Sequence, residues 1–195
     1  MVVVITGVSS GIGLEIARLL ASKQYRVYGL SRTKIEEANI ISLETDITQE
    51  ASIQKSIQAI MNREGRIDVL VNNAGMGISG SVEYAAMKDI KDLYDVNFFG
   101  MIQVTQSVLP YMRKNHFGKV IQISSVAGVL SIPFQAIYSS SKAAVLSYAD
   151  ALLEEVSPYG ISVTTVLPGD IKTEFTASRK KNKNDNPAYG ERIVK

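Results

Sequence analysis

The chain has 195 residues, the length of one domain, and its 46% apolar and 21% charged content is typical of soluble globular proteins. A formal net charge of +2 is too small for a nucleic-acid-binding face, and the lack of cysteine excludes disulfides and thiol chemistry. The apolar run at residues 2–5 has no basic residue before it and is too short for a signal peptide or a membrane span. We therefore expect a cytoplasmic protein that binds neither nucleic acid nor membranes.

The first half of the chain alternates between predicted strands and predicted helices. The β-branched run at 2–5 predicts a strand buried on both faces, and apolar residues at helical spacing between 12 and 20 predict a helix after it. Short apolar runs predict further strands, and a one-sided apolar pattern predicts a second helix. These strands lie at 26–30, 40–43 and 67–71, and the second helix lies at 50–64.

The second half repeats this order, with helices predicted at about 100–114 and 138–157 and strands at 119–124 and 161–167. Strands that alternate with helices of this length imply an α/β fold with a parallel sheet covered on both faces. The polar and basic segment 179–186 is interpreted as a solvated loop or lid rather than a site for an anionic partner. His116, near the end of a predicted helix, is interpreted as a terminal charge or cap and not as a catalytic residue.

Three glycines, Gly7, Gly11 and Gly13, lie where the first strand turns into the first helix. Small residues in such a turn let the backbone approach a pyrophosphate, and the helix N-terminus supplies unpaired N–H groups and the positive end of its dipole. A nucleoside-triphosphate loop is disfavoured because no Lys-Ser/Thr pair follows the last glycine. The turn therefore predicts a dinucleotide site.

The end of the second strand indicates which dinucleotide binds. NAD-binding units carry an acidic residue there for the ribose hydroxyls, whereas this chain has Ser31-Arg32-Thr33. Arg32 can pair with the additional phosphate of NADP. We therefore expect NADP(H) to be preferred, with NAD(H) as the alternative cofactor. Arg32 also fits a purely structural interpretation as a solvated charge at the end of a strand.

Tyr138 and Lys142 are four residues apart on a predicted helix, so they share one of its faces. The Lys142 charge favours the phenolate, and general acid–base work near neutral pH asks for a pKa about three units below the ordinary value of ~10. Ser125 lies at the end of a predicted strand thirteen residues upstream. A Tyr–Lys pair alone also fits an ordinary helix surface.

The motifs occur together in the order found in short-chain dehydrogenases/reductases, and the chain resembles that family from Val2 to about Phe175. They are, in chain order, Thr6-Gly7 with Gly11-Ile12-Gly13; Asp46; Asn72-Asn73-Ala74-Gly75; Asn97; Ser125; Tyr138 with Lys142; and Pro168-Gly169 with Thr173. Residues 134–138, with Glu154, Val156, Tyr159 and Gly160 downstream, faintly resemble the hydroxysteroid- and retinol-dehydrogenase-like branch.

The resemblance implies a role for each matching residue. Tyr138 is expected to be the general acid in reduction and the general base in oxidation, Lys142 to lower its pKa, and Ser125 to bind the substrate oxygen. Asn97 is expected to anchor a water that links Lys142 to solvent. The expected cofactor contacts, with Tyr138 and Lys142, are Gly7, Ser9, Ser10, Gly11, Ile12, Gly13, Ser31, Arg32, Asp46, Ile47, Asn73, Ala74, Gly75, Pro168, Gly169, Ile171 and Thr173. The asparagines also fit a purely structural use at strand and helix ends.

The resemblance further implies a Rossmann-type, doubly wound, three-layer fold in one dinucleotide-binding domain. The family pattern has seven strands, and we expect six here, with the C-terminal substrate segment truncated after about residue 175. Pairing through the helices at 100–114 and 138–157 is expected to give a homodimer, or a homotetramer with a second interface.

The function expected from the resemblance is hydride transfer between the nicotinamide and a carbonyl or alcohol substrate, without a metal. Residues 76–78 and 128–134 are expected to line an apolar substrate entrance. The alternative is a non-catalytic dinucleotide-binding sensor or scaffold, which the intact Ser125, Tyr138 and Lys142 disfavour.

Overall fold

The computed structural model describes residues 1–171, 175, 179–181 and 189, and its main sheet is parallel throughout. The strand order is β3-β2-β1-β4-β6-β7. The strands are β1 (Val2–Thr6), β2 (Arg26–Ser31), β3 (Ile40–Glu44), β4 (Val69–Asn72), β6 (Gly118–Ile123) and β7 (Ile161–Val166). The predicted Rossmann-type sheet is confirmed, with six strands in the described part of the chain.

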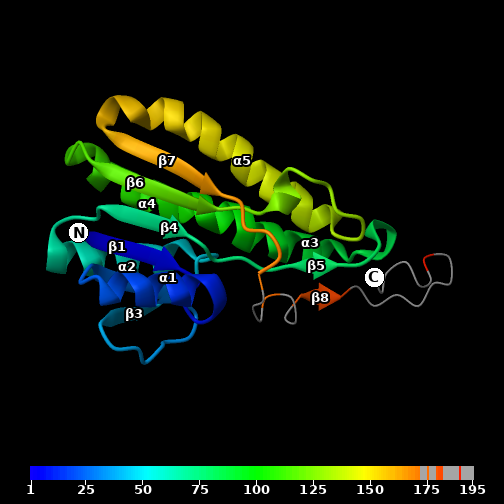
Figure 1. Cartoon of the computed structure of the whole chain (residues 1–195), viewed down its shortest axis with the longest axis horizontal. Coiled ribbons are helices and arrows are strands. Elements are labelled where there is room, and N and C mark those ends of the chain that lie inside the picture. Colours follow the sequence, from blue (N-terminus) through cyan, green and yellow to red (C-terminus); the bar gives the residue numbers. More distant parts are fainter. Residues whose placement is uncertain (172–174, 176–178, 182–188, 190–195) are drawn as a thin grey trace.

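Helices lie on both faces of this sheet, which gives three layers (Figure 1). On one face, α2 (Glu50–Glu64), α4 (Met101–Lys114) and α5 (Ala136–Val156) pack on Val2 and Val4. On the other, α1 (Gly11–Ser22) packs on Val3 and Ile5. Successive strand residues point to opposite faces, so the continuous apolar run of β1 fills both cores.

The helical region before α4 is longer than the sequence predicts. It starts with α3 (Met87–Tyr94), passes through a π-helical segment, η2 (Asp95–Gly100), and continues as α4. The wider π turn shifts the apolar residues out of helical phase, so the 3.6-residue period does not extend through it. The helix predicted at about 100–114 is confirmed as α4, whereas α3 and η2 before it were not predicted.

Two short strands, β5 (Ile78–Ser79) and β8 (Lys180–Lys181), form a second parallel sheet that the sequence did not predict. This pairing brings residues 179–181 beside the segment that follows β4 (Figure 1). Within the segment 179–186, interpreted from the sequence as a solvated loop or lid, Lys180 and Lys181 are indeed exposed but pair as a short strand, and residues 182–186 lie outside the described residues. Short 3₁₀ turns complete the elements: η1 (Val82–Tyr84), η3 (Val126–Gly128) and η4 (Ser157–Tyr159).

His116 follows α4 in the left-handed region, with φ 48°, and its N–H donates to the Arg113 carbonyl at 3.2 Å. This geometry agrees with the predicted role at the helix end.

Hydrogen bonds join the carboxyl ends of β1 and β4. The Thr6 hydroxyl oxygen accepts from the N–H groups of Asn73 and Ala74, both at 3.0 Å. The Asn73 side-chain amide donates to the carbonyls of Thr6 and Gly7, also at 3.0 Å. Thr6 is buried, so water cannot replace its hydroxyl as the acceptor.

We predict that Thr6→Val lowers the free energy of unfolding by about 2 kcal/mol, because it leaves two N–H groups without their acceptor. Thr6→Ser is the matched control, since it loses the methyl group but keeps the oxygen. Urea denaturation of the two variants and the parent measures the effect. Equal stability of the Val and Ser variants would contradict this account.

Candidate active site

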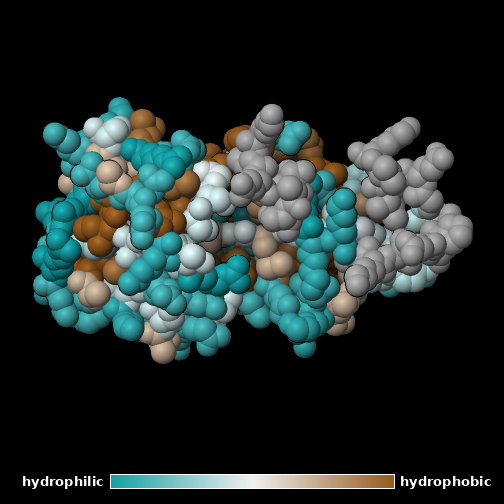
Figure 2. All heavy atoms as spheres, turned by 90° about the horizontal axis from the view of Figure 1, so that it is seen from below, coloured by the Kyte–Doolittle hydropathy of each residue, from teal (hydrophilic) through white to brown (hydrophobic). Residues whose placement is uncertain are grey.

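A cavity of about 580 Å³ opens along the carboxyl ends of the parallel strands. In doubly wound sheets, ligands bind at this edge, where the chain connections diverge to opposite faces. Figure 2 shows a mostly polar face with a hollow near its middle. The sequence-predicted residues that line the cavity are Gly7, Ser9, Ser10, Gly11, Ile12, Ser31, Arg32, Asp46, Ile47, Asn73, Ala74, Gly75, Ser125, Tyr138, Lys142, Pro168, Gly169 and Ile171.

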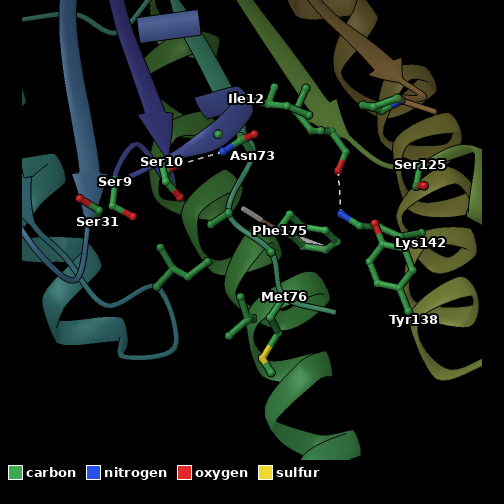
Figure 3. A pocket seen from close by; sticks show the side chains of 18 of the residues that line it. Ser9, Ser10, Ile12, Ser31, Asn73, Met76, Ser125, Tyr138, Lys142 and Phe175 are labelled. Atoms are coloured by element: carbon green, nitrogen blue, oxygen red, sulfur yellow. Dashed lines mark hydrogen bonds between the residues drawn. The ribbon is translucent and has the colours of Figure 1, made fainter. Parts of the chain in front are cut away.

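The glycine turn forms one end of the cavity, with Ser9, Ser10 and Asn73 around it (Figure 3). Gly7 takes φ +72°, a conformation that costs little only for glycine. A Cβ on Gly13 would lie 2.3 Å from both the Gly7 carbonyl oxygen and the Asn73 amide nitrogen, so no side chain fits there. Ser10 makes no side-chain cap to α1, which leaves the first-turn N–H groups for an anionic ligand.

Tyr138, Lys142 and Ser125 lie together at the other end (Figure 3). Tyr138 and Lys142 stand on the same face of α5, with the Lys142 Nζ 5.9 Å from the centre of the Tyr138 ring. The Lys142 ammonium donates to the Ile123 carbonyl at 2.9 Å. Ser125 follows β6 and accepts from the Ala127 N–H at 3.1 Å, which fixes its hydroxyl oxygen.

Burial dominates the electrostatics of this group. Tyr138 is 7% exposed and Lys142 4% exposed. Burial raises the pKa of Tyr138, while the Ser125 hydroxyl and the Arg179 charge oppose that rise. Burial lowers the pKa of Lys142 to about 8, because no carboxylate compensates its charge. Lys142 is not among the groups that shift the pKa of Tyr138 in the cofactor-free protein. Its role in lowering that pKa together with an oxidised nicotinamide ring stays a prediction.

Asn97 lies in the π-helical segment η2 and is 2% exposed. Its side-chain oxygen accepts from the Met76 N–H at 2.8 Å, and its amide donates to the Met76 carbonyl at 3.0 Å and to the Ser141 hydroxyl at 3.1 Å. Asn97 thus joins α5 to the segment after β4 and fixes the wall of the cavity beside Lys142.

Residues that follow the carboxyl ends of β2 and β3 line a further side of the cavity. Arg32 is exposed and lines the cavity just beyond β2. The Asp46 carboxylate accepts from the Thr48 N–H at 2.9 Å and from its hydroxyl at 2.8 Å, so it also shapes the turn before α2. A positive charge and an ordered turn therefore face the same space.

The family model for short chain dehydrogenases matches residues 1–184. The chain belongs to the short-chain dehydrogenase/reductase family.

Three relatives of this family are similar to the chain. A 3-ketodihydrosphingosine reductase from Bacteroides thetaiotaomicron is 44% identical over 179 residues, which cover 91% of this chain and 66% of that protein. Human retinol dehydrogenase 8 is 34% identical, over 89% of this chain and 60% of its own length. The chain spans about two thirds of these curated relatives. A solved structure of ElxO with NADP bound has a TM-score of 0.84 at 31% identity, over 89% of this chain and 75% of that one.

Within the described part of the chain, two predicted residues of the short-chain dehydrogenase/reductase site do not line the cavity. Gly13 and Asn97 are buried beside it and support the residues that do. Thr173 lies outside the described residues.

The predicted apolar entrance was only partly correct. Met76 lines the cavity, but the segment 128–134 does not. Val129 and Leu130 are 61% and 67% exposed, whereas Ile132 packs in the small core that includes Tyr138. An apolar run without a strong period does not show which side of a loop faces the ligand.

Sequence reasoning missed several residues that shape the site. Phe175 packs against Tyr138, with ring centres 5.8 Å apart, and Arg179 lines the cavity. The buried Ser124 hydroxyl donates to the Lys142 carbonyl at 2.8 Å. Ser124 and Ser141 are adjacent to predicted residues, and that adjacency was the one available signal. Phe175 and Arg179 come close to the site only through the tertiary fold, so no local sequence pattern indicates them.

Within the described residues, no cluster of His, Cys, Asp or Glu has the arrangement of a metal site. None of the helices in the same part of the chain is both long and apolar enough to cross a bilayer. The cytoplasmic location stays a prediction.

The lowered pKa of Lys142 predicts a pH-dependent stability. Between pH 8 and pH 10 the unfolded chain keeps the Lys142 proton that the folded protein has lost, so the free energy of unfolding rises with pH. The rise over this window amounts to about 2 kcal/mol. Lys142→Met, which has an unbranched side chain without charge, is predicted to lack this contribution.

The measurement is urea denaturation of the cofactor-free protein and of Lys142→Met at several pH values from 7 to 10. All other titrating groups are common to both proteins and cancel in the difference. Parallel stability curves would show that Lys142 keeps an ordinary pKa when folded.

Proposed function

We propose that this chain is an NADP(H)-dependent oxidoreductase that interconverts a carbonyl compound and an alcohol. One observation carries the proposal: a single cavity has the glycine turn at one end and Tyr138, Lys142 and Ser125 at the other. The names of the relatives, a ketone reductase and a retinol dehydrogenase, support this reaction class. A non-catalytic sensor would not require that buried acid–base group.

The cavity fits a nicotinamide dinucleotide. The turn at Gly7 and Gly13 leaves room for a pyrophosphate against the N-terminus of α1. Arg32 beyond β2 supports NADP over NAD, because its charge pairs with the additional phosphate, and the NADP-bound ElxO structure supports the same choice. When bound, the cofactor supplies or accepts the hydride.

The chain's own residues hold the substrate oxygen and move the proton. In the direction of reduction, Tyr138 donates its phenolic proton to the carbonyl oxygen, and the Ser125 hydroxyl donates a hydrogen bond to the same oxygen. The resulting phenolate takes a proton from the neighbouring Lys142 ammonium. A lysine whose pKa is about 8 releases a proton more readily than an ordinary lysine does.

The structure around Gly75 supports a path that returns the proton to Lys142. A Cβ at this glycine would lie 3.3 Å from the Asn97 side-chain oxygen and 3.6 Å from the Lys142 Nζ. The bare glycine therefore lets the backbone pass close to both polar groups. A water held near Asn97 would connect the lysine to solvent, which is the role proposed for Asn97.

The substrate is proposed to be a carbonyl compound with an apolar body. Met76, Val96 and Phe175 line the cavity, and Phe175 packs on Tyr138 where the substrate has to lie.

We also propose a homodimer through α4 and α5. Phe99, just before α4, is 50% exposed, and we place it in this interface.

Tyr138→Phe is predicted to lower kcat by at least a hundredfold, because the ring keeps its packing and loses the proton. The dissociation constant for NADPH is expected to change less than about threefold. Turnover is followed as loss of NADPH absorbance with a panel of apolar ketones and aldehydes, and binding by calorimetry.

Tyr148→Phe is the matched control, because Tyr148 lies on the same helix and packs against Phe98, away from the cavity. Full turnover in Tyr138→Phe would refute the proton-transfer role. Absence of turnover in the folded, NADPH-binding parent across the panel would contradict the enzymatic proposal.

A further inference from the structure

Arg179 reaches the cavity from the segment that leads into β8. The Lys180 N–H donates to the Gly77 carbonyl at 2.9 Å, and β8 pairs with β5, so this segment is held beside Met76. A Cβ on Gly77 would lie 2.8 Å from the Arg179 Cγ. The bare glycine therefore gives the arginine side chain room to lie against the cavity wall.

The Arg179 guanidinium has an aromatic neighbour and no described counter-ion. Its central carbon lies 5.6 Å from the centre of the Phe175 ring. Its Nε is sealed from solvent and finds no acceptor within the described part of the chain. No ion pair of Arg179 occurs among the same residues. An arginine whose Nε is buried without an acceptor is stabilised when an anion pairs with its guanidinium.

Two carboxylates of α3 are paired with lysines, and two further carboxylates, Asp95 and Asp170, line the cavity without an ion pair to Arg179 among the described residues. Asp89 pairs with Lys180, and Asp92, which lines the cavity, pairs with Lys88 at 2.7 Å. Arg179 thus supplies a positive charge at the catalytic end of the cavity. Its influence reaches Tyr138, whose pKa it lowers against the effect of burial.

We propose that Arg179 binds an acidic substituent of the substrate, so that the carbonyl compound reduced at Tyr138 carries a carboxylate, phosphate or sulfonate group. The planar guanidinium matches these oxyanions through paired N–H donors. The apolar contacts of Met76 and Phe175 hold the rest of the substrate. This inference rests on the proposed carbonyl-reducing activity.

Position separates Arg179 from the cofactor phosphate site. Arg32 lies beyond β2, at the glycine-turn end, whereas Arg179 contacts Phe175, which packs on Tyr138. Loss of the Arg179 charge is therefore expected to leave NADPH binding unchanged.

The test compares the reduction of oxo-acids with that of their methyl esters. In these oxo-acids the carboxylate lies two to six carbons from the carbonyl. Ketoalkyl phosphonates and sulfonates are included to show which oxyanion is preferred. The parent protein is expected to reduce at least one acid with a kcat/KM at least tenfold above that of its ester. Arg179→Met is expected to abolish this preference, because kcat/KM falls at least tenfold further for the acid than for its ester, and Arg179→Lys is expected to restore part of it. Lys181→Met is the matched control, because Lys181 is exposed and does not line the cavity.

A second measurement does not depend on turnover. Calorimetry measures the binding of medium-chain carboxylates, alkylphosphonates and alkylsulfonates to the NADP-saturated protein and to Arg179→Met. Binding by the parent and at least tenfold weaker binding by Arg179→Met support an anion site at Arg179, whether or not a tested ketone is reduced. Absence of reduction would instead count against the proposed function. Equal reduction of acids and esters by the parent, or an equal loss for both in Arg179→Met, would overturn it.

Discussion

Thr6 and Asn73 join the carboxyl ends of β1 and β4, and the site depends on this junction. One hydroxyl accepts two N–H groups from the segment after β4, and one amide donates to two carbonyls of the glycine turn. The chain connections leave these two neighbouring strands for opposite faces of the sheet. The junction therefore lies at the edge of the sheet where a ligand binds, and it fixes the glycine turn and the segment after β4 relative to each other.

Hydrogen bonds of buried polar groups also fix the backbone at the catalytic end of the cavity. Asn97 holds Met76, Ser124 holds the Lys142 carbonyl, and Lys142 itself is anchored to Ile123. A buried lysine without a carboxylate partner costs stability, yet its lowered pKa suits a group that passes protons near neutral pH. The buried charge of Lys142 thus costs stability at the position where the proposed proton transfer takes place.

Sequence reasoning worked where the signal is local. The helix predicted at 50–64 coincides with α2, because its apolar period is regular and Gly65 follows it in the left-handed conformation. The glycine turn and the Tyr138–Lys142 pair were predicted because strand–turn and helix spacings fix them. The π turn at Asn97 was not predicted and the entrance at 128–134 was predicted poorly, since neither segment has a regular apolar period. Arg179 was missed because its position comes from the pairing of strands about a hundred residues apart.

The central claim, that the cavity binds NADP with the glycine turn and Arg32, is tested most directly by calorimetric titration with NADPH and NADH. The account predicts that the parent binds NADPH at least tenfold more tightly, and that Arg32→Asp reverses this preference without loss of the fold. No binding of either dinucleotide by a chain that circular dichroism shows to be folded would contradict the claim. An unchanged preference in Arg32→Asp would show that another residue recognises the phosphate.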